Sequence, residues 1–195
     1  MNINNFFKID ENLLALDKAA LEKCQAQFGG IDETTEYNQL KVLKAFIDNG
    51  VSESYFTGST GYGYDDRGRE ILERVMAQCM GAEDSLMRHN FVSGTHTLAV
   101  MLFGVLRPGD TMLCLTGRPY DTLIGVLGFD GESDGSLKDF GVNYEEIALN
   151  EEGRPDIEKI KETLKTKFYK VAYIQRSRGY SLRPSLTVEE IGVLA

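Results

Sequence analysis

Apolar residues in the first part of the chain recur at three- and four-residue steps, which is the spacing of one face of an amphipathic helix. Three segments show this period, and each ends at or just before a glycine, a residue that commonly follows the last turn of a helix. The segments are residues 13–28, 34–48 and 67–80. The pattern therefore predicts three helices, the first of them stopping at Gly29-Gly30.

Beyond residue 80 the pattern changes, because short apolar runs alternate with helical periods. The short runs predict strands over residues 85–89, 111–115, 142–149 and 171–175. The segments between them predict helices over residues 95–106, 120–127 and 155–165. Strands that alternate with helices indicate an α/β domain with a mostly parallel sheet and flanking helices.

Residues 185–195 predict a further helix that has a start signal but no stop signal. Ser185 or Thr187 can cap its start, and carboxylates follow in its first turn. The sequence ends after about two turns of this helix. The alternation of strands and helices is still continuing where this helix begins. The pattern therefore predicts a truncated domain.

Composition and charge narrow the range of functions. The chain has 195 residues, 42% of them hydrophobic, and is long enough to bury a sizeable core. Its formal net charge of −9 gives no general attraction to nucleic acid or to an anionic membrane surface. No apolar run approaches the roughly 18 residues of a membrane-spanning helix, and no signal-peptide pattern opens the sequence. Three cysteines without a CxxC pair are typical of reduced thiols, so we expect a cytoplasmic protein.

A Ser-Gly-Thr turn is the first candidate site. Ser93, Gly94 and Thr95 lie between a predicted strand and an apolar helix. Free backbone N–H groups, two hydroxyls and the positive end of the helix dipole would all face a ligand there, and Gly94 has no side chain to block its approach. The turn fits a phosphate, although Ser and Thr also cap helices that bind nothing.

Further candidates follow the predicted strands, since ligands of parallel sheets collect outside the carboxyl ends of the strands. Tyr120 follows the strand over 111–115, where it can stack on a planar ligand or simply pack a loop. Three arginines follow the strand over 171–175, namely Arg176, Arg178 and Arg183. Their guanidinium groups suit a carboxylate or phosphate, and they can equally pair with the surplus acidic residues.

A loop rich in glycine and tyrosine precedes the helix over 67–80. Tyr62 and Tyr64 in this loop can donate to a phosphate or pack locally. The two histidines, His89 and His96, have too few potential ligands around them in the sequence for a metal site, so no metal is expected. No P-loop or HExxH motif is present.

The order of these motifs resembles that of fold-type-I pyridoxal-phosphate (PLP) enzymes, and within them the cystathionine and methionine lyase branch. Three stretches resemble a narrower group even more closely than they resemble this branch. It is the bacterial group called the methionine gamma-lyase family or aluminium-resistance protein. The stretches are GYGYDDRGR at 61–69, FVSGTHT at 91–97 and IQRSRGYSLRPS at 174–185. The likeness covers essentially the whole chain. It implies the large domain of aminotransferase fold type I, truncated, with a helical segment over 1–55 and the N-terminal part of the PLP-binding domain over 56–195.

The resemblance also implies roles for individual residues. The family's phosphate-binding turn matches Ser93, Gly94 and Thr95, and the aromatic residue that stacks on the pyridine ring matches Tyr120. The loop that reaches the phosphate of a neighbouring subunit matches Tyr62 and Tyr64. Arg178, with Arg176, falls where the lyases place a residue near the ring oxygen or the substrate carboxylate. The lyases' Asn-Pro-Thr segment is replaced here by this arginine-rich one.

Two further catalytic groups of the family are expected beyond residue 195. They are the lysine that holds PLP as a Schiff base and the Asp that pairs with the pyridine nitrogen. The last lysine of this chain is Lys170, at the start of a predicted strand.

The resemblance thus implies the N-terminal part of a PLP-dependent lyase that cleaves a carbon–sulfur bond of a sulfur amino acid by β- or γ-elimination. This part is expected to be inactive alone, and the full-length enzyme is expected to form a homodimer or homotetramer. An alternative is a cofactor-free binding or regulatory α/β module that is complete at 195 residues. A dinucleotide enzyme is a third hypothesis, but no GxGxxG motif follows a strand.

Overall fold

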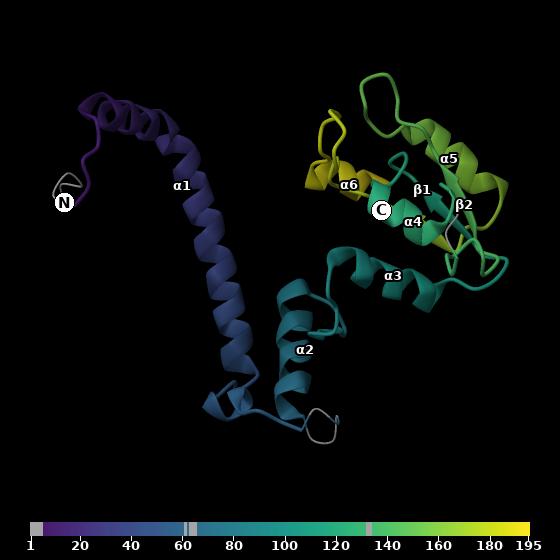
Figure 1. Cartoon of the computed structure of the whole chain (residues 1–195), viewed down its shortest axis with the longest axis horizontal. Helices are drawn as coiled ribbons and strands as arrows, with labels where there is room; N and C mark the ends of the chain where they lie inside the picture. The colour runs from purple at the N-terminus through teal and green to yellow at the C-terminus, as the bar shows by residue number, and fades with distance from the viewer. Residues whose placement is uncertain (1–5, 61, 63–65, 132–133) are drawn as a thin grey trace. The chain divides into compact units, whose positions relative to one another are not determined.

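The structure is a computed structural model that describes residues 6–60, 62, 66–131 and 134–195. The chain divides into two compact units, Met1–Arg88 and His89–Ala195. The first is helical and the second is an α/β unit, as their elements in Figure 1 show. The division of the sequence between residues 55 and 56 into a helical segment and a cofactor-binding domain stays a prediction.

The first unit begins with one long helix where the sequence predicted two. Helix α1 runs without interruption from Glu11 to Asp48, through Gly29 and Gly30. A glycine costs only about 1 kcal/mol inside a helix, and good helix formers on both sides propagate across the pair. The side chain of Thr34 donates to the carbonyl of Gly30, which satisfies that backbone group in a second way. Within the described residues no helix, α1 included, combines the length and apolar character that crossing a membrane requires.

The C-terminal end of α1 packs against helix α2, Arg67–Met80. Ala45 of α1 is buried, as are Ile71 and Val75 of α2. At the edge of this contact, Gln78 donates to a carboxylate oxygen of Asp48 at 2.8 Å and accepts from the side chain of Asn49 at 2.8 Å. The bounds of α2 are those predicted, and a short 3-10 helix, Glu53–Phe56, precedes it.

The strand predicted over residues 85–89 is absent from the structure. The side chain of Ser85 instead donates to the carbonyl of Glu73 at 2.7 Å, and the backbone N–H of Met87 donates to the Glu73 carboxylate at 3.2 Å. Arg88 pairs with the same carboxylate. The polar groups of this segment are therefore satisfied by α2, and the segment does not pair with a strand.

The second unit is built on a three-stranded parallel sheet, which confirms the α/β prediction in this coarse form. Its strands lie in the order β2-β1-β3. Their bounds are Thr111–Cys114 for β1, Asn143–Glu146 for β2 and Val171–Tyr173 for β3. The helices are α3 (Gly94–Val105), α4 (Asp121–Leu127), α5 (Ile157–Thr166) and α6 (Val188–Leu194). Each strand is shorter than predicted, because apolar residues continue past the paired segment.

The sheet is covered on both faces, since side chains of β1 alternate between two apolar clusters. Met112 and Cys114 pack with buried leucines of α3 and α4 on one face. Leu113 and Leu115 pack with Ile160 of α5 on the other face, where Leu194 of α6 also lies. A central strand buried on both sides reads as a continuous apolar run, as the sequence TMLCL does.

Burial separates the cysteines chemically, which gives a prediction. Desolvation raises the pKa of the Cys114 thiol from 9.0 to about 12, whereas Cys24 on α1 is exposed. Because the thiolate is the reactive form, we expect a thiol reagent at pH 8 to label Cys24 rapidly and Cys114 only after unfolding. Labelling followed by peptide mass spectrometry tests this, and rapid labelling of native Cys114 would contradict the burial of β1.

Candidate functional site

The Ser93-Gly94-Thr95 turn forms the N-terminus of α3. Ser93 is the N-cap, and its hydroxyl accepts a hydrogen bond from the backbone N–H of His96 at 3.1 Å. The N–H groups of Gly94 and Thr95 precede the first helical hydrogen bonds, so they have no acceptor within the helix. A Cβ atom at Gly94 would meet nothing within 4 Å, so the backbone is open there. This is the predicted phosphate-type geometry, with donors free at the positive end of a helix dipole.

Tyr120 is tied to this turn through its hydroxyl. Its phenol oxygen lies 3.2 Å from the hydroxyl oxygen of Thr95, which in turn lies 3.1 Å from that of Thr122. Tyr120 is also the N-cap residue of α4, at the carboxyl edge of the sheet. The structure therefore brings together two of the elements predicted separately from the sequence.

A buried glutamine, not predicted as a site residue, fixes Tyr120 from the other side. The side-chain oxygen of Gln175 accepts from the backbone N–H of Tyr120 at 3.0 Å, and its amide nitrogen donates to the carbonyl of Ser177 at 3.0 Å. Its backbone N–H donates to the hydroxyl of Thr116 at 2.9 Å. Gln175 thus joins the ends of β1 and β3. A polar residue directly after an apolar strand was the signal that could have revealed it.

A cavity of about 540 Å³ opens beside Tyr120. Its lining includes Tyr120, Gln175 and three arginines, Arg118, Arg178 and Arg183. Arg118 forms an ion pair with Asp130 at the rim. This arrangement places a flat aromatic side chain and several cationic groups at the edge of the sheet where ligands of parallel sheets bind.

The arginines predicted from the sequence differ in their placement. Arg178 lines the cavity, whereas Arg176 is not among the lining residues and its Nε donates to the carbonyl of Leu186 at 3.2 Å. Arg183, the third of the arginines named as candidates from the sequence, lines the cavity and is partly buried. Tyr62 is exposed in the first unit, and Tyr64 lies outside the described residues.

The cavity lining carries three guanidinium groups and two carboxylates, those of Asp121 and Asp130, so positive charge is in excess. Tyr173, on β3 below it, has its pKa raised to about 12 by burial and then by the nearby Tyr120, so this phenol is neutral at neutral pH. Burial lowers the pKa of the Arg183 guanidinium from its ordinary value. Arginine nevertheless stays protonated at neutral pH, and the site suits an anionic ligand.

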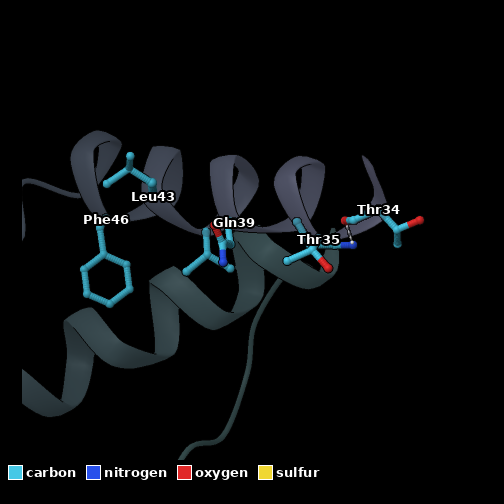
Figure 2. A pocket seen from close by; sticks show the side chains of 7 residues that line it. Thr34, Thr35, Gln39, Leu43 and Phe46 are labelled. Atoms are coloured by element: carbon cyan, nitrogen blue, oxygen red, sulfur yellow. Dashed lines mark hydrogen bonds between the residues drawn. The ribbon is translucent and has the colours of Figure 1, made fainter. Parts of the chain in front are cut away.

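A second hollow lies along α1 in the first unit and has a different character. The residues that line it lie between Thr34 and Phe46 in the sequence, and all of these lining residues are uncharged. Figure 2 shows Thr34 and Thr35 at one end and the ring of Phe46 at the other. It offers no cation for a phosphate or carboxylate. Nor do His, Cys, Asp and Glu side chains gather as a metal site anywhere in the described part of the chain.

Fold and site together define an α/β protein whose carboxyl sheet edge carries an aromatic side chain and several guanidinium groups beside a cavity. Comparison with known sequences then gives the family. Residues 13–195 match the profile of the family described as methionine gamma-lyase. The chain belongs to the methionine gamma-lyase family, which confirms the resemblance seen in its motifs.

Solved structures of similar proteins support this assignment. A candidate cystathionine beta-lyase involved in aluminium resistance, from Clostridium acetobutylicum, is 44% identical with a TM-score of 0.89, and the match covers 98% of this chain and 46% of that one. A carbon–sulfur lyase involved in aluminium resistance, from Clostridium novyi NT, is 45% identical with a TM-score of 0.86, covering 94% and 44%.

Among curated proteins, the uncharacterised protein YnbB of Bacillus subtilis (strain 168) is 45% identical over 181 residues. These cover 90% of this chain and 42% of YnbB. The chain thus spans less than half the length of the relatives it matches.

Proposed function

We propose that these residues form the N-terminal part of a PLP-dependent carbon–sulfur lyase of fold type I, which acts on a sulfur amino acid by β- or γ-elimination. Family membership and the names of the similar solved structures support lyase chemistry. The observation that carries the proposal is the contact between Thr95 of the Ser-Gly-Thr turn and Tyr120, beside a cavity that contains arginines.

The residues of the site fit PLP part by part. The free N–H groups at Gly94 and Thr95, with the hydroxyl of Ser93, suit its phosphate. The Tyr120 side chain suits stacking on the pyridine ring, because its hydroxyl contacts Thr95 and its backbone N–H donates to Gln175. Arg178, which lines the cavity, suits the carboxylate of an amino-acid substrate, and Arg176 precedes it by two residues.

Each of these residues has a task that follows from its placement. When bound, PLP supplies an electron sink for the negative charge left on the substrate when its α-proton is removed. The turn anchors the phosphate, so the ring keeps one position during the reaction. Tyr120 keeps the ring plane fixed and shields one of its faces from water. The cofactor-anchoring lysine and the aspartate for the pyridine nitrogen are proposed to lie in the rest of a longer polypeptide.

We also propose that the full-length enzyme is a homodimer or homotetramer. The side chain of Tyr62 is 83% exposed, and the family resemblance gives its loop a role in a neighbour's phosphate site. Loss of cofactor affinity on dilution to monomers, measured by analytical ultracentrifugation and absorbance, would support this role. Full PLP affinity in a monomer would contradict it.

The function is tested with the full-length enzyme. We expect visible absorbance from bound PLP and release of a 2-oxo acid from L-cystathionine or L-methionine. With cystathionine, pyruvate indicates β-elimination and 2-oxobutanoate indicates γ-elimination. Norleucine, which has methionine's shape without sulfur, is the control and should give no product. A colourless protein that binds no PLP would contradict the proposal and favour the cofactor-free alternative.

A prediction for the phosphate turn follows. Ser93→Ala removes both the cap of α3 and a hydroxyl at the phosphate, so we expect PLP affinity to fall by about tenfold. Thr187→Ala is the matched control, because Thr187 caps α6 with the same type of hydrogen bond, to the N–H of Glu190. Equal PLP affinities of the two variants, measured by equilibrium dialysis, would remove Ser93 from the site.

A further inference from the structure

An ion pair stands at the rim of the cavity beside Tyr120. Arg118 precedes helix α4, and Asp130 follows its C-cap residue, Gly128. The guanidinium of Arg118 donates to the carboxylate of Asp130, so the pair joins the segments on either side of the helix. Both residues line the cavity. One positive and one negative group therefore lie next to each other where a ligand in the cavity meets both.

The two side chains are accessible to such a ligand. The side chain of Arg118 is 50% exposed and that of Asp130 is 68% exposed. An ion pair as exposed as this contributes little to stability, because water screens it. Each residue can therefore exchange its partner for a ligand group of the same charge at little cost. The guanidinium of Arg118 keeps its charge at neutral pH, so it remains available to an anionic group.

The thioether amino acids that the proposed function allows differ in how their side chains end. Methionine ends in a methyl group, which offers no charge to either residue. Cystathionine ends in a second amino-acid group, with an ammonium and a carboxylate on one carbon. Such an end can place its carboxylate on Arg118 and its ammonium on Asp130, which pairs all four charges in charge-assisted hydrogen bonds. An end with a single charge would pair with one residue and meet a like charge on the other.

We propose that Arg118 and Asp130 bind the zwitterionic outer end of the substrate's side chain, beyond its sulfur, and so favour a substrate of the cystathionine type over methionine. This inference rests on the proposed function and adds to it a site for the part of the substrate remote from the reacting bond. The α-carboxylate is proposed to bind Arg178, which leaves the pair at the rim for the outer end. The cavity volume of about 540 Å³ is within the range of small-molecule sites.

Four ligands test the pair in the full-length, PLP-loaded enzyme. They are L-cystathionine, S-(3-carboxypropyl)-L-cysteine without the outer ammonium, S-(3-aminopropyl)-L-cysteine without the outer carboxylate, and S-propyl-L-cysteine without either group. Stopped-flow absorbance gives each dissociation constant before product forms. The variants are Arg118→Gln and Asp130→Asn, with Lys161→Gln and Glu158→Gln as matched controls. Lys161 and Glu158 also form an exposed ion pair, on α5, and do not line the cavity.

We expect the wild-type enzyme to bind L-cystathionine about tenfold or more tightly than S-propyl-L-cysteine. Arg118→Gln and Asp130→Asn should each remove most of this preference. Each should also strengthen binding of one singly charged ligand, because it removes a like charge. Asp130→Asn should favour the carboxypropyl ligand, and Arg118→Gln the aminopropyl ligand. A residue that only stabilised α4 would not produce these opposite changes.

Equal binding of all four ligands by the wild-type enzyme would overturn the inference, and this comparison applies even if a variant does not fold. Equal changes for all four ligands in Arg118→Gln and Asp130→Asn, or changes as large in Lys161→Gln and Glu158→Gln, would also overturn it. An enzyme that cleaves these thioethers without distinguishing their outer ends would leave the proposed function intact. An enzyme that binds no PLP would overturn the proposed function itself.

Discussion

Gly128→Ala is expected to lower the free energy of unfolding by about 3–5 kcal/mol. Gly128 ends helix α4 with φ +81°, in the left-handed region that a side chain disfavours. A Cβ atom there would also lie 2.0 Å from the hydroxyl oxygen of Ser136, which is buried. Because Ser136 is fixed by hydrogen bonds from its N–H and its hydroxyl to Asp139, it cannot move aside cheaply.

Gly109→Ala separates the two causes. Gly109 has a similar φ of +91°, but a Cβ atom there would meet nothing within 4 Å. Gly109→Ala should therefore lower the free energy of unfolding only by the cost of the left-handed backbone conformation, about 1–2 kcal/mol. Urea unfolding of the full-length protein, followed by circular dichroism, compares the two. Equal losses would show that the segment after α4 does not pack against Gly128 as the structure has it.

The glycines also show where the sequence was a reliable guide to helix ends. Gly81 follows α2 as predicted, because the chain turns there into an irregular segment. Gly29 and Gly30 carry the same local signal, yet α1 passes through them. Whether a glycine ends a helix depends on what the following residues can bond to, and a local pattern does not contain that information.

The strand predicted over residues 85–89 failed for a related reason. Its apolar residues fit a short strand, but Glu73, on α2, accepts its hydrogen bonds. In the second unit, by contrast, β1 was found because a central strand buried on both faces requires a continuous apolar run, whereas the paired residues of β2, Asn143–Glu146, are largely polar. Burial on both faces makes the pattern of β1 specific.

The residues of the candidate site likewise divide into those that the sequence could identify and those that it could not. Ser93 as a helix cap and Tyr120 at a strand end follow from local rules, and the structure places both as those rules predict. Arg183 is held by carbonyls only six and eight residues earlier in the chain. Gln175 acts through contacts across the sheet edge, between segments tens of residues apart in sequence. Such contacts become visible only when the fold sets β1 and β3 side by side.

Tyr120→Ala is expected to weaken PLP binding by about tenfold to a hundredfold. Stacking of an aromatic side chain on a planar heterocycle contributes about 1–3 kcal/mol. The Tyr120 phenol contacts Thr95, and the backbone of Tyr120 is held by Gln175. The Gln175 contact is made to the backbone of Tyr120, so it survives the substitution. The loss therefore reports on the ring itself. Fluorescence titration of the full-length enzyme with PLP measures it.

Tyr120→Phe distinguishes stacking from hydrogen bonding in the same experiment. It keeps the ring and removes the hydroxyl that lies 3.2 Å from Thr95, so affinity should fall by less than about tenfold. Tyr144→Phe is the control, since its phenol donates to Glu146 on β2, outside the lining of the cavity. If Ala and Phe at position 120 weaken PLP binding equally, the hydroxyl and not the ring matters. If neither differs from Tyr144→Phe, the cofactor does not bind against Tyr120, and the turn at Ser93 would have to bind a phosphate of another kind of ligand.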